Sequence, residues 1–244
     1  MPVFFIHTQD VVDGVVTITD PLLTHISKSL RAKCGDTLIF NDENGHRYHT
    51  TVRDITKRAL QSTIHQVDKP PVSTRPRLIL AQALLKGEKM GWVIQKATEL
   101  GVAAIVPLIS ERVILKLSGR QGDTHHARWK RIALEAAQQS ERWDLPTILP
   151  IHTFQEFLET PRPYPTIFMA ERNEGASLLN FPYAEEQPEA EVTVIIGPEG
   201  GWGQKEVKAA DSHQYLFASF GQEILRAETA SLAALAILQA RFTP

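Results

Sequence analysis

The stretch VTVIIGPEGGWGQKE, residues 192–206, decides the fold, because an apolar run leads through a glycine-rich loop into a polar segment. The run VTVII predicts a strand that is buried on both faces, and the residues after Gly203 predict the start of a helix. At the carboxyl end of a parallel strand, glycines let the backbone approach a ligand, and the helix start offers free amide groups. We therefore predict a ligand site here, although a plain tight turn would give the same pattern.

Similar apolar runs occur at residues 77–85, 102–109 and 165–171, and segments of helical period separate them. This alternation predicts an α/β domain with a parallel sheet and crossover helices. The first of these helices should bury Met90, Val93, Ile94, Ala97 and Leu100, with Lys89, Trp92, Lys96 and Glu99 on its opposite face. A second helix is expected over residues 124–142. The last helix, residues 228–241, is apolar nearly all round, which predicts burial by the sheet or by a second subunit.

The N-terminal part has a different hydrophobic pattern, with short strand-like runs separated by turn signals. The runs lie at residues 3–6, 15–19, 37–40, 48–55 and 60–67, a pattern typical of a small β-barrel. Residues 68–76, DKPPVSTRP, contain three prolines and predict a linker. We therefore expect two domains, one over residues 1–70 and one over residues 76–244.

Several classes of protein are excluded by composition. The single cysteine, Cys34, cannot form an internal disulfide, and the adjoining His125 and His126 lack partners at the spacing of a metal site. We expect no bound metal and take both histidines as surface residues. The apolar stretch at residues 229–240 is shorter than the roughly 18 to 20 residues that span a bilayer. With no signal peptide at the N-terminus, we expect a cytoplasmic protein that does not contact membranes.

The charge is unevenly distributed, although the net charge is only -2. Residues 111–131 contain six basic and two acidic side chains, and Lys28, Arg31 and Lys33 form a second, weaker basic group. Such patches attract phosphate backbones, which favours a nucleic-acid partner. A solvated surface segment would have the same composition.

Two loops carry the candidate chemistry. The loop with Glu199 lacks the Gly-Lys-Ser/Thr ending of a triphosphate site, and its acidity suits a ligand with cationic groups, such as S-adenosylmethionine. The second loop, FGQEILRAETASLAAL at residues 220–235, gathers Gly221, Arg226, Glu228 and Thr229 where the last helix begins. Capping of that helix by Thr229, with Arg226 exposed, is the alternative. If the two loops follow neighbouring strands, they form one pocket.

Five segments resemble the ribosomal RNA small subunit methyltransferase E family, whose members methylate N3 of a uridine in 16S ribosomal RNA. They are HISKSLRAKCGD (25–36), QKATELGVAAIVPLISER (95–112), EAAQQSERWDLP (135–146), IGPEGG (196–201) and ILRAETA (224–230). The resemblance implies a PUA-like N-terminal β-barrel that binds RNA, and a SPOUT methyltransferase domain with a parallel sheet and a deep trefoil knot. It also implies a homodimer. The chain departs from the family at Val3, where members often have an arginine, and at Ala227, where threonine is usual.

The same resemblance assigns roles to individual residues. The residues expected to bind S-adenosylmethionine are Gly197, Pro198, Glu199, Gly200, Gly201, Phe220, Gly221, Ile224, Leu225, Thr229 and Ala230. Those expected to bind 16S ribosomal RNA or the small ribosomal subunit are Arg31, Lys96, Glu99, Arg112 and Arg142.

Our hypothesis for the reaction is in-line attack of uridine N3 on the sulfonium methyl group. Arg226 would stabilise the negative charge that develops on the base, and Glu228 would act as a base or an orienting group. Two other functions remain open: a non-catalytic RNA-binding protein of ribosome assembly with the same fold, and a nucleotide-binding hydrolase.

Overall fold

A computed structural model of the chain describes residues 3–72, 75–113, 119–161, 165–170, 175–180 and 191–242. The chain divides into two compact units, each of which is described by itself. The first unit comprises Met1–Val72 together with Ala137–Leu145, and the second comprises Ser73–Ala136 together with Pro146–Pro244. The sequence had placed residues 137–145 in the second domain, so this segment changes its assignment.

The first unit contains a half-barrel sheet with the strand order β1-β4-β5-β6-β3-β2. Neighbouring strands are antiparallel except β1 and β4, which are parallel. The strands are β1 (Val3–Phe5), β2 (Val11–Val12), β3 (Val15–Ile18), β4 (Thr37–Asn41), β5 (Arg47–Ile55) and β6 (Leu60–Asp68). All five predicted strands are present, and β2 is a two-residue addition. Short helical turns, η1 (Thr8–Asp10), α1 (Leu22–Thr24) and η2 (His25–Ser29), complete the unit, and the core gathers around Phe4, Ile26, Phe40 and Leu60.

Side chains of the half-barrel hold the segment of residues 137–145 through its main chain. The amide of Asn41 donates to the carbonyl oxygens of Arg142, at 2.8 Å, and Trp143, at 3.1 Å. The guanidinium of Arg47 lies 3.9 Å from the centroid of the Trp143 ring and donates to the carbonyl of Glu141 at 2.9 Å. These partners are about a hundred residues apart, so no local pattern could reveal the contact.

The second unit contains a parallel sheet with the order β10-β8-β7-β13-β11-β14-β12, and β9 pairs with β8. The predicted α/β fold is therefore confirmed. The strands are β7 (Arg77–Ala83), β8 (Ala104–Ile109), β9 (Thr147–Ile148), β10 (His152–Thr153), β11 (Thr166–Met169), β12 (Ala176–Ser177), β13 (Glu191–Ile196) and β14 (Leu216–Ser219). The helices are α2 (Lys89–Glu99), α3 (Gly119–Gln139), α4 (Phe154–Glu159), η3 (Leu178–Asn180), α5 (Gln204–Ser212) and α6 (Ala227–Arg241).

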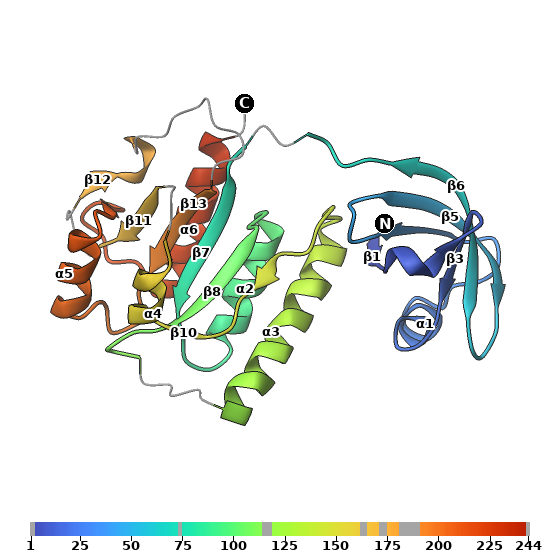
Figure 1. Cartoon of the computed structure of the whole chain (residues 1–244), viewed down its shortest axis with the longest axis horizontal. Helices are drawn as coiled ribbons and strands as arrows, with labels where there is room; N and C mark the ends of the chain where they lie inside the picture. Colours follow the sequence, from blue (N-terminus) through green and yellow to red (C-terminus); the bar gives the residue numbers. More distant parts are fainter. Residues whose placement is uncertain are drawn as a thin grey trace. The chain divides into compact units, whose positions relative to one another are not determined.

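Helices cover both faces of the parallel sheet (Figure 1). Alternate residues of a strand point to opposite faces, so Val194 joins a core with α2, α3 and α6, whereas its neighbour Ile195 joins a core with α4 and α5. This double burial explains why the strands are continuous apolar runs rather than alternating ones. No helix in the described ranges has both the length and the apolar character that a membrane span requires.

The helices largely follow the predicted stripes. Met90, Val93, Ile94 and Ala97 of α2 are buried, as expected, and Leu100 is half-buried just beyond the helix. Helix α3 begins and ends earlier than predicted, and its largest buried side chain is Trp129, one turn before the apolar stripe that the sequence predicts from Ile132 to Ser140. On the same helix, His126 is half-buried rather than a surface residue, with Nε2 2.8 Å from the carbonyl oxygen of Ile148.

Candidate functional site

The two candidate loops do not follow neighbouring strands. Strand β11 lies between β13 and β14 and pairs in parallel with both, so the condition under which we expected a shared pocket is not met. Strand β11 precedes both β13 and β14 in the sequence, and its place between them in the sheet is a non-local feature that no local pattern records. The loops nevertheless close over the end of β11 and line one cavity of about 520 Å³.

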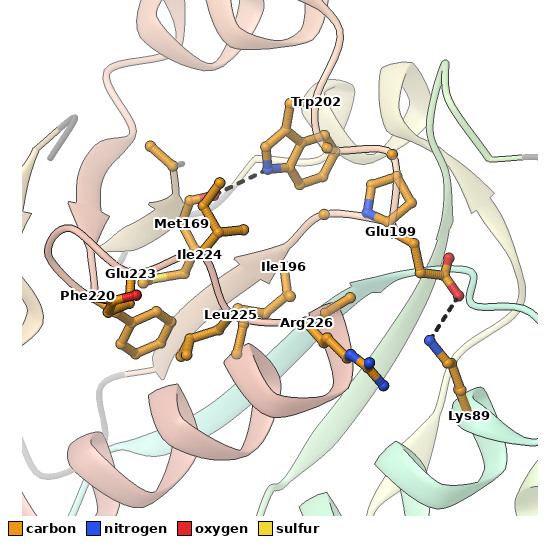
Figure 2. Close-up of a pocket in the computed structure, with 17 residues that line it drawn as sticks. Lys89, Met169, Ile196, Glu199, Trp202, Phe220, Glu223, Ile224, Leu225 and Arg226 are labelled. Carbon is orange, nitrogen blue, oxygen red and sulfur yellow. Dashed lines mark hydrogen bonds and ion pairs between the residues drawn. The ribbon is translucent and has the colours of Figure 1, made fainter. Parts of the chain in front are cut away.

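The cavity walls come from both loops and from elements that the sequence did not single out (Figure 2). Nine residues predicted to bind the cofactor line it, and so does Arg226, which was predicted as catalytic; the nine are Gly197, Pro198, Glu199, Gly200, Gly201, Phe220, Ile224, Leu225 and Ala230. Gly221, in the second loop, and Glu228 and Thr229, in the first turn of α6, lie outside the lining. Seven further lining residues were not predicted, namely Lys89, Met169, Ala170, Ile196, Trp202, Glu223 and Ala227.

Packing within the protein leaves little room for side chains larger than glycine in the loop after β13. A Cβ atom on Gly197 would lie 3.0 Å from Nε1 of Trp202, and one on Gly200 would lie 3.3 Å from Cβ of Arg112. The guanidinium of Arg112 also donates to the carbonyl of Gly200, with Nη1 2.9 Å from the oxygen. The loop is thus pressed between an indole ring and an arginine, which leaves its backbone facing the cavity.

Trp202 joins the glycine loop to the end of β11. Its Nε1–H donates to the carbonyl of Met169 at 3.1 Å, and its ring packs on Phe168, with the centroids 4.7 Å apart. Phe154 of α4 adds a third ring, 5.2 Å from Trp202. The middle strand of the site is therefore fixed by a side chain that the sequence reveals only as one more apolar residue.

Glu206, buried at the start of α5, holds the other end of this loop. One carboxylate oxygen accepts the N–H of Gly203 and the other accepts the N–H of Glu111, each at 2.8 Å. The two bonds join the segment after β8 to the segment after β13. A buried carboxylate needs hydrogen-bond donors, so Glu206 keeps both N–H groups as partners and fixes the two segments relative to each other.

The start of α6 is fixed by a buried polar pair rather than by a side-chain cap. Arg226 occupies the N-cap position with extended backbone and makes no side-chain cap bond, so capping by the exposed Thr229 is not what the structure has. One turn later, the hydroxyl of Ser231 has two acceptors for its one proton, the amide oxygen of Gln82 and the carbonyl oxygen of Ala227, the latter at 2.8 Å. Gln82 stands beside Ile196 in the sheet, so this contact ties α6 to the cavity floor.

Charged groups gather at one side of the cavity. Lys89 Nζ lies 3.2 Å from Oε1 of Glu228 and 3.6 Å from Oε1 of Glu199. Burial acts to raise the pKa of Glu228, but hydrogen bonds from its own backbone N–H and from Lys89, with the charges of Lys89 and Arg226, hold that pKa below its ordinary value. Glu228 is therefore a carboxylate at neutral pH.

The residues predicted to bind RNA have varied surroundings. In the first unit, Arg31 is exposed, with a positive φ of 54°, whereas the side chain of Arg142 is only 10% exposed and pairs with Asp144 at 3.1 Å. In the second unit, Lys96 and Glu99 pair with each other at 2.8 Å. Arg112 contacts the glycine loop, as described above.

Two further features of the sequence bear on RNA binding. Val3, which stands where an arginine was expected, is fully buried in β1 and can make no RNA contact. Of the basic run at residues 111–131, Lys116 lies outside the described residues. Arg128 of that run pairs with Glu88.

The chain is similar to known methyltransferases over most of its length. The model of the RNA methyltransferase domain family matches residues 73–239. The ribosomal RNA small subunit methyltransferase E of Synechocystis sp. is 32% identical over 95% of this chain and 75% of its own length. The corresponding protein of Bacillus subtilis is 28% identical over 91% of this chain and 88% of its own length. The crystal structure of the Neisseria gonorrhoeae protein of the same name, bound to S-adenosyl methionine, has a TM-score of 0.87 and 30% identity, covering 98% of this chain and 97% of that one.

Proposed function

The chain belongs to the ribosomal RNA small subunit methyltransferase E family, and on this premise we propose that it methylates N3 of a uridine in 16S ribosomal RNA. Its cofactor is S-adenosylmethionine, and its reaction is methyl transfer to ribosomal RNA. The observation that carries the finer proposal is the single cavity that the loops after β13 and β14 form over the end of β11. A cationic side chain, Arg226, lies on its wall.

The cavity fits the cofactor in size and chemistry. Its volume of about 520 Å³ lies within the range of roughly 300 to 1,000 Å³ that small-molecule sites occupy. Ile196, Phe220 and Leu225 offer apolar contact for an adenine ring, and the carboxylates of Glu199 and Glu223 complement cationic groups. We assign the cofactor to the predicted residues that line the cavity, and keep Gly221 and Thr229 as predictions from the same loops. When bound, S-adenosylmethionine supplies a methyl group activated by a positively charged sulfur.

Arg226 is the proposed catalytic residue. Uridine N3 carries a proton and its lone pair is delocalised, so a nearby guanidinium would favour the anionic form of the base that can accept a methyl group. Arg226 precedes α6 in extended conformation, with its side chain exposed on the cavity wall.

Glu228 is better suited to orientation than to proton removal. Its lowered pKa makes it a weak base, because a carboxylate that readily loses its proton binds a substrate proton poorly. Its ion pair with Lys89 gives it a defined partner instead. We therefore propose Glu228 as an orienting group.

We also propose an RNA-binding domain, a trefoil knot and a homodimer. The half-barrel of the first unit would be a PUA-like RNA-binding domain, and Arg31, Lys96, Glu99, Arg112 and Arg142 would contact RNA. The loops around the cavity would belong to a trefoil knot. A second copy would pack on α6, where the apolar Leu232, Ala233 and Ile237 are only partly buried. Because ribosomal RNA lies in the cytoplasm, the protein would act there.

Primer extension tests the proposal. A methyl group on N3 blocks Watson–Crick pairing, so reverse transcriptase should stop at one uridine of 16S ribosomal RNA after incubation of small subunits with the protein and S-adenosylmethionine. Omitting the cofactor should abolish the stop. Incorporation of a labelled methyl group without any stop would contradict N3 as the target. Binding of RNA without incorporation would instead support the non-catalytic alternative.

A further inference from the structure

Lys89 contacts carboxylates from both loops of the cavity. It is the first residue of α2, which follows β7 and belongs to neither loop. Its Nζ lies 3.6 Å from Oε1 of Glu199, in the loop after β13, and 3.2 Å from Oε1 of Glu228, in the first turn of α6 (Figure 2 shows the first pair). One ammonium group therefore bridges the two halves of the site from a third element.

Both carboxylates are held in place by contacts with the segment that carries Lys89. Oε1 of Glu199 also accepts the backbone N–H of Lys86 at 3.2 Å, so the β7–α2 connection holds this residue twice. The side chain of Glu228 is 16% exposed, and its Oε2 is buried without a hydrogen-bond partner among the described residues. Loss of Lys89 would leave the partly exposed carboxylate of Glu228 without its ion-pair partner, and a small movement of the first turn of α6 toward solvent would hydrate it at little cost to the stability of the fold.

We propose that Lys89 is a positioning residue of the cofactor site, which sets the glycine loop after β13 at a fixed separation from the start of α6. The inference deepens the proposed function and rests on it. The side chain of Lys89 is 38% exposed, so solvent screens the ion pairs and they add little to the stability of the fold. Their effect is on geometry, because displacement of a binding loop by about 1 Å is enough to lower activity strongly.

Calorimetric titration of S-adenosylmethionine into the full-length protein tests this role without any RNA. Lys89→Met keeps the aliphatic chain and removes the charge, and we expect it to weaken binding about tenfold with an unchanged thermal unfolding midpoint. Lys89→Arg, which can still bridge two carboxylates, should recover most of the affinity. A matched control is Arg77→Met, because Arg77 pairs with Glu191 at 3.1 Å between β7 and β13 at the opposite end of the same strands. It should bind like the wild type.

A double-mutant cycle identifies the partner through which Lys89 acts. In a Glu228→Gln background, Lys89→Met should cost clearly less affinity than in the wild type, because the pair is already broken. Fully additive losses, wild-type affinity in Lys89→Met, no recovery by Lys89→Arg, or a lowered unfolding midpoint would each overturn the inference. Failure of the wild type to bind S-adenosylmethionine would instead contradict the function on which the inference rests.

Discussion

The indole N–H of Trp202 donates to the main-chain carbonyl of Met169 across 3.1 Å, and this bond joins the glycine loop to the middle strand of the site. It adds a side-chain link between the end of β11 and the loop after β13 to the main-chain ladder of the sheet. The relationship explains how two loops on strands that are not adjacent can share one cavity. It also identifies a side chain whose effect on the cofactor can be measured.

Trp202→Phe should lower both stability and cofactor affinity. The ring is kept in part, but the buried carbonyl of Met169 loses its donor, which costs about 1 to 3 kcal/mol of unfolding free energy. We expect a severalfold loss of S-adenosylmethionine affinity, because Met169 lines the cavity. Urea denaturation and calorimetry measure the two effects. Trp92→Phe is the control, since Trp92 is 43% exposed on α2, and equal effects of both substitutions would contradict the assignment.

Ser231→Ala should destabilise the protein by about 1 to 3 kcal/mol, because the buried amide oxygen of Gln82 loses its partner. Replacing both residues, with Gln82→Leu added, should restore part of the loss, since the unpaired amide oxygen of Gln82 is then removed. Urea denaturation of the single and double variants tests this. A double variant less stable than the sum of the single effects would show that the pair is not the relevant contact.

Arg226→Ala should reduce methyl transfer by about a hundredfold to a thousandfold, the range found when one charge-stabilising donor is removed from an active site. Affinity for S-adenosylmethionine should stay nearly unchanged, because the proposed partner of Arg226 is the nucleobase. The rate is measured by incorporation of a labelled methyl group. Arg241→Ala, at the far end of the same helix, serves as the control. Retained turnover in Arg226→Ala would remove this residue from the mechanism.

Asp42→Asn should make stability less dependent on acid pH. Burial acts to raise the pKa of Asp42, but hydrogen bonds from Tyr48 and from the backbone and ring of His46 outweigh it and hold that pKa below 3.8. A lowered pKa in the folded state stabilises the protein above pH 3.8, and this contribution is lost as the pH falls through the folded pKa.

Urea denaturation midpoints at a series of pH values test the Asp42 prediction. The wild type should be more stable than Asp42→Asn at pH 7 and pH 5, and the gap should narrow below about pH 4. A gap that stays constant over the whole range would mean that Asp42 contributes only as a neutral hydrogen-bond acceptor.

The sequence by itself determined the classes of structure and the location of the main loop. Apolar runs such as VTVII and RLILAQALL identified strands buried on both faces, and the stripe through Met90 and Ile94 identified α2, because these signals depend only on local periodicity. The glycines of residues 197–201 marked the cavity wall for the same reason. The missing side chains that let the backbone lie close to a ligand belong to the same residues that form the cavity wall, so a local pattern is enough to find them.

Only the tertiary structure decided which segments meet. It inserted β11 between β13 and β14, brought Met169, Trp202 and Lys89 to the cavity, and joined residues 137–145 to the half-barrel through Asn41. Nothing local distinguishes Met169 in its apolar run or Lys89 on its helix from side chains with a purely structural or solvated role. Strand order and contacts across about a hundred residues depend on how the whole chain packs. The free energy of that packing comes from many residues together, so no single segment predicts it.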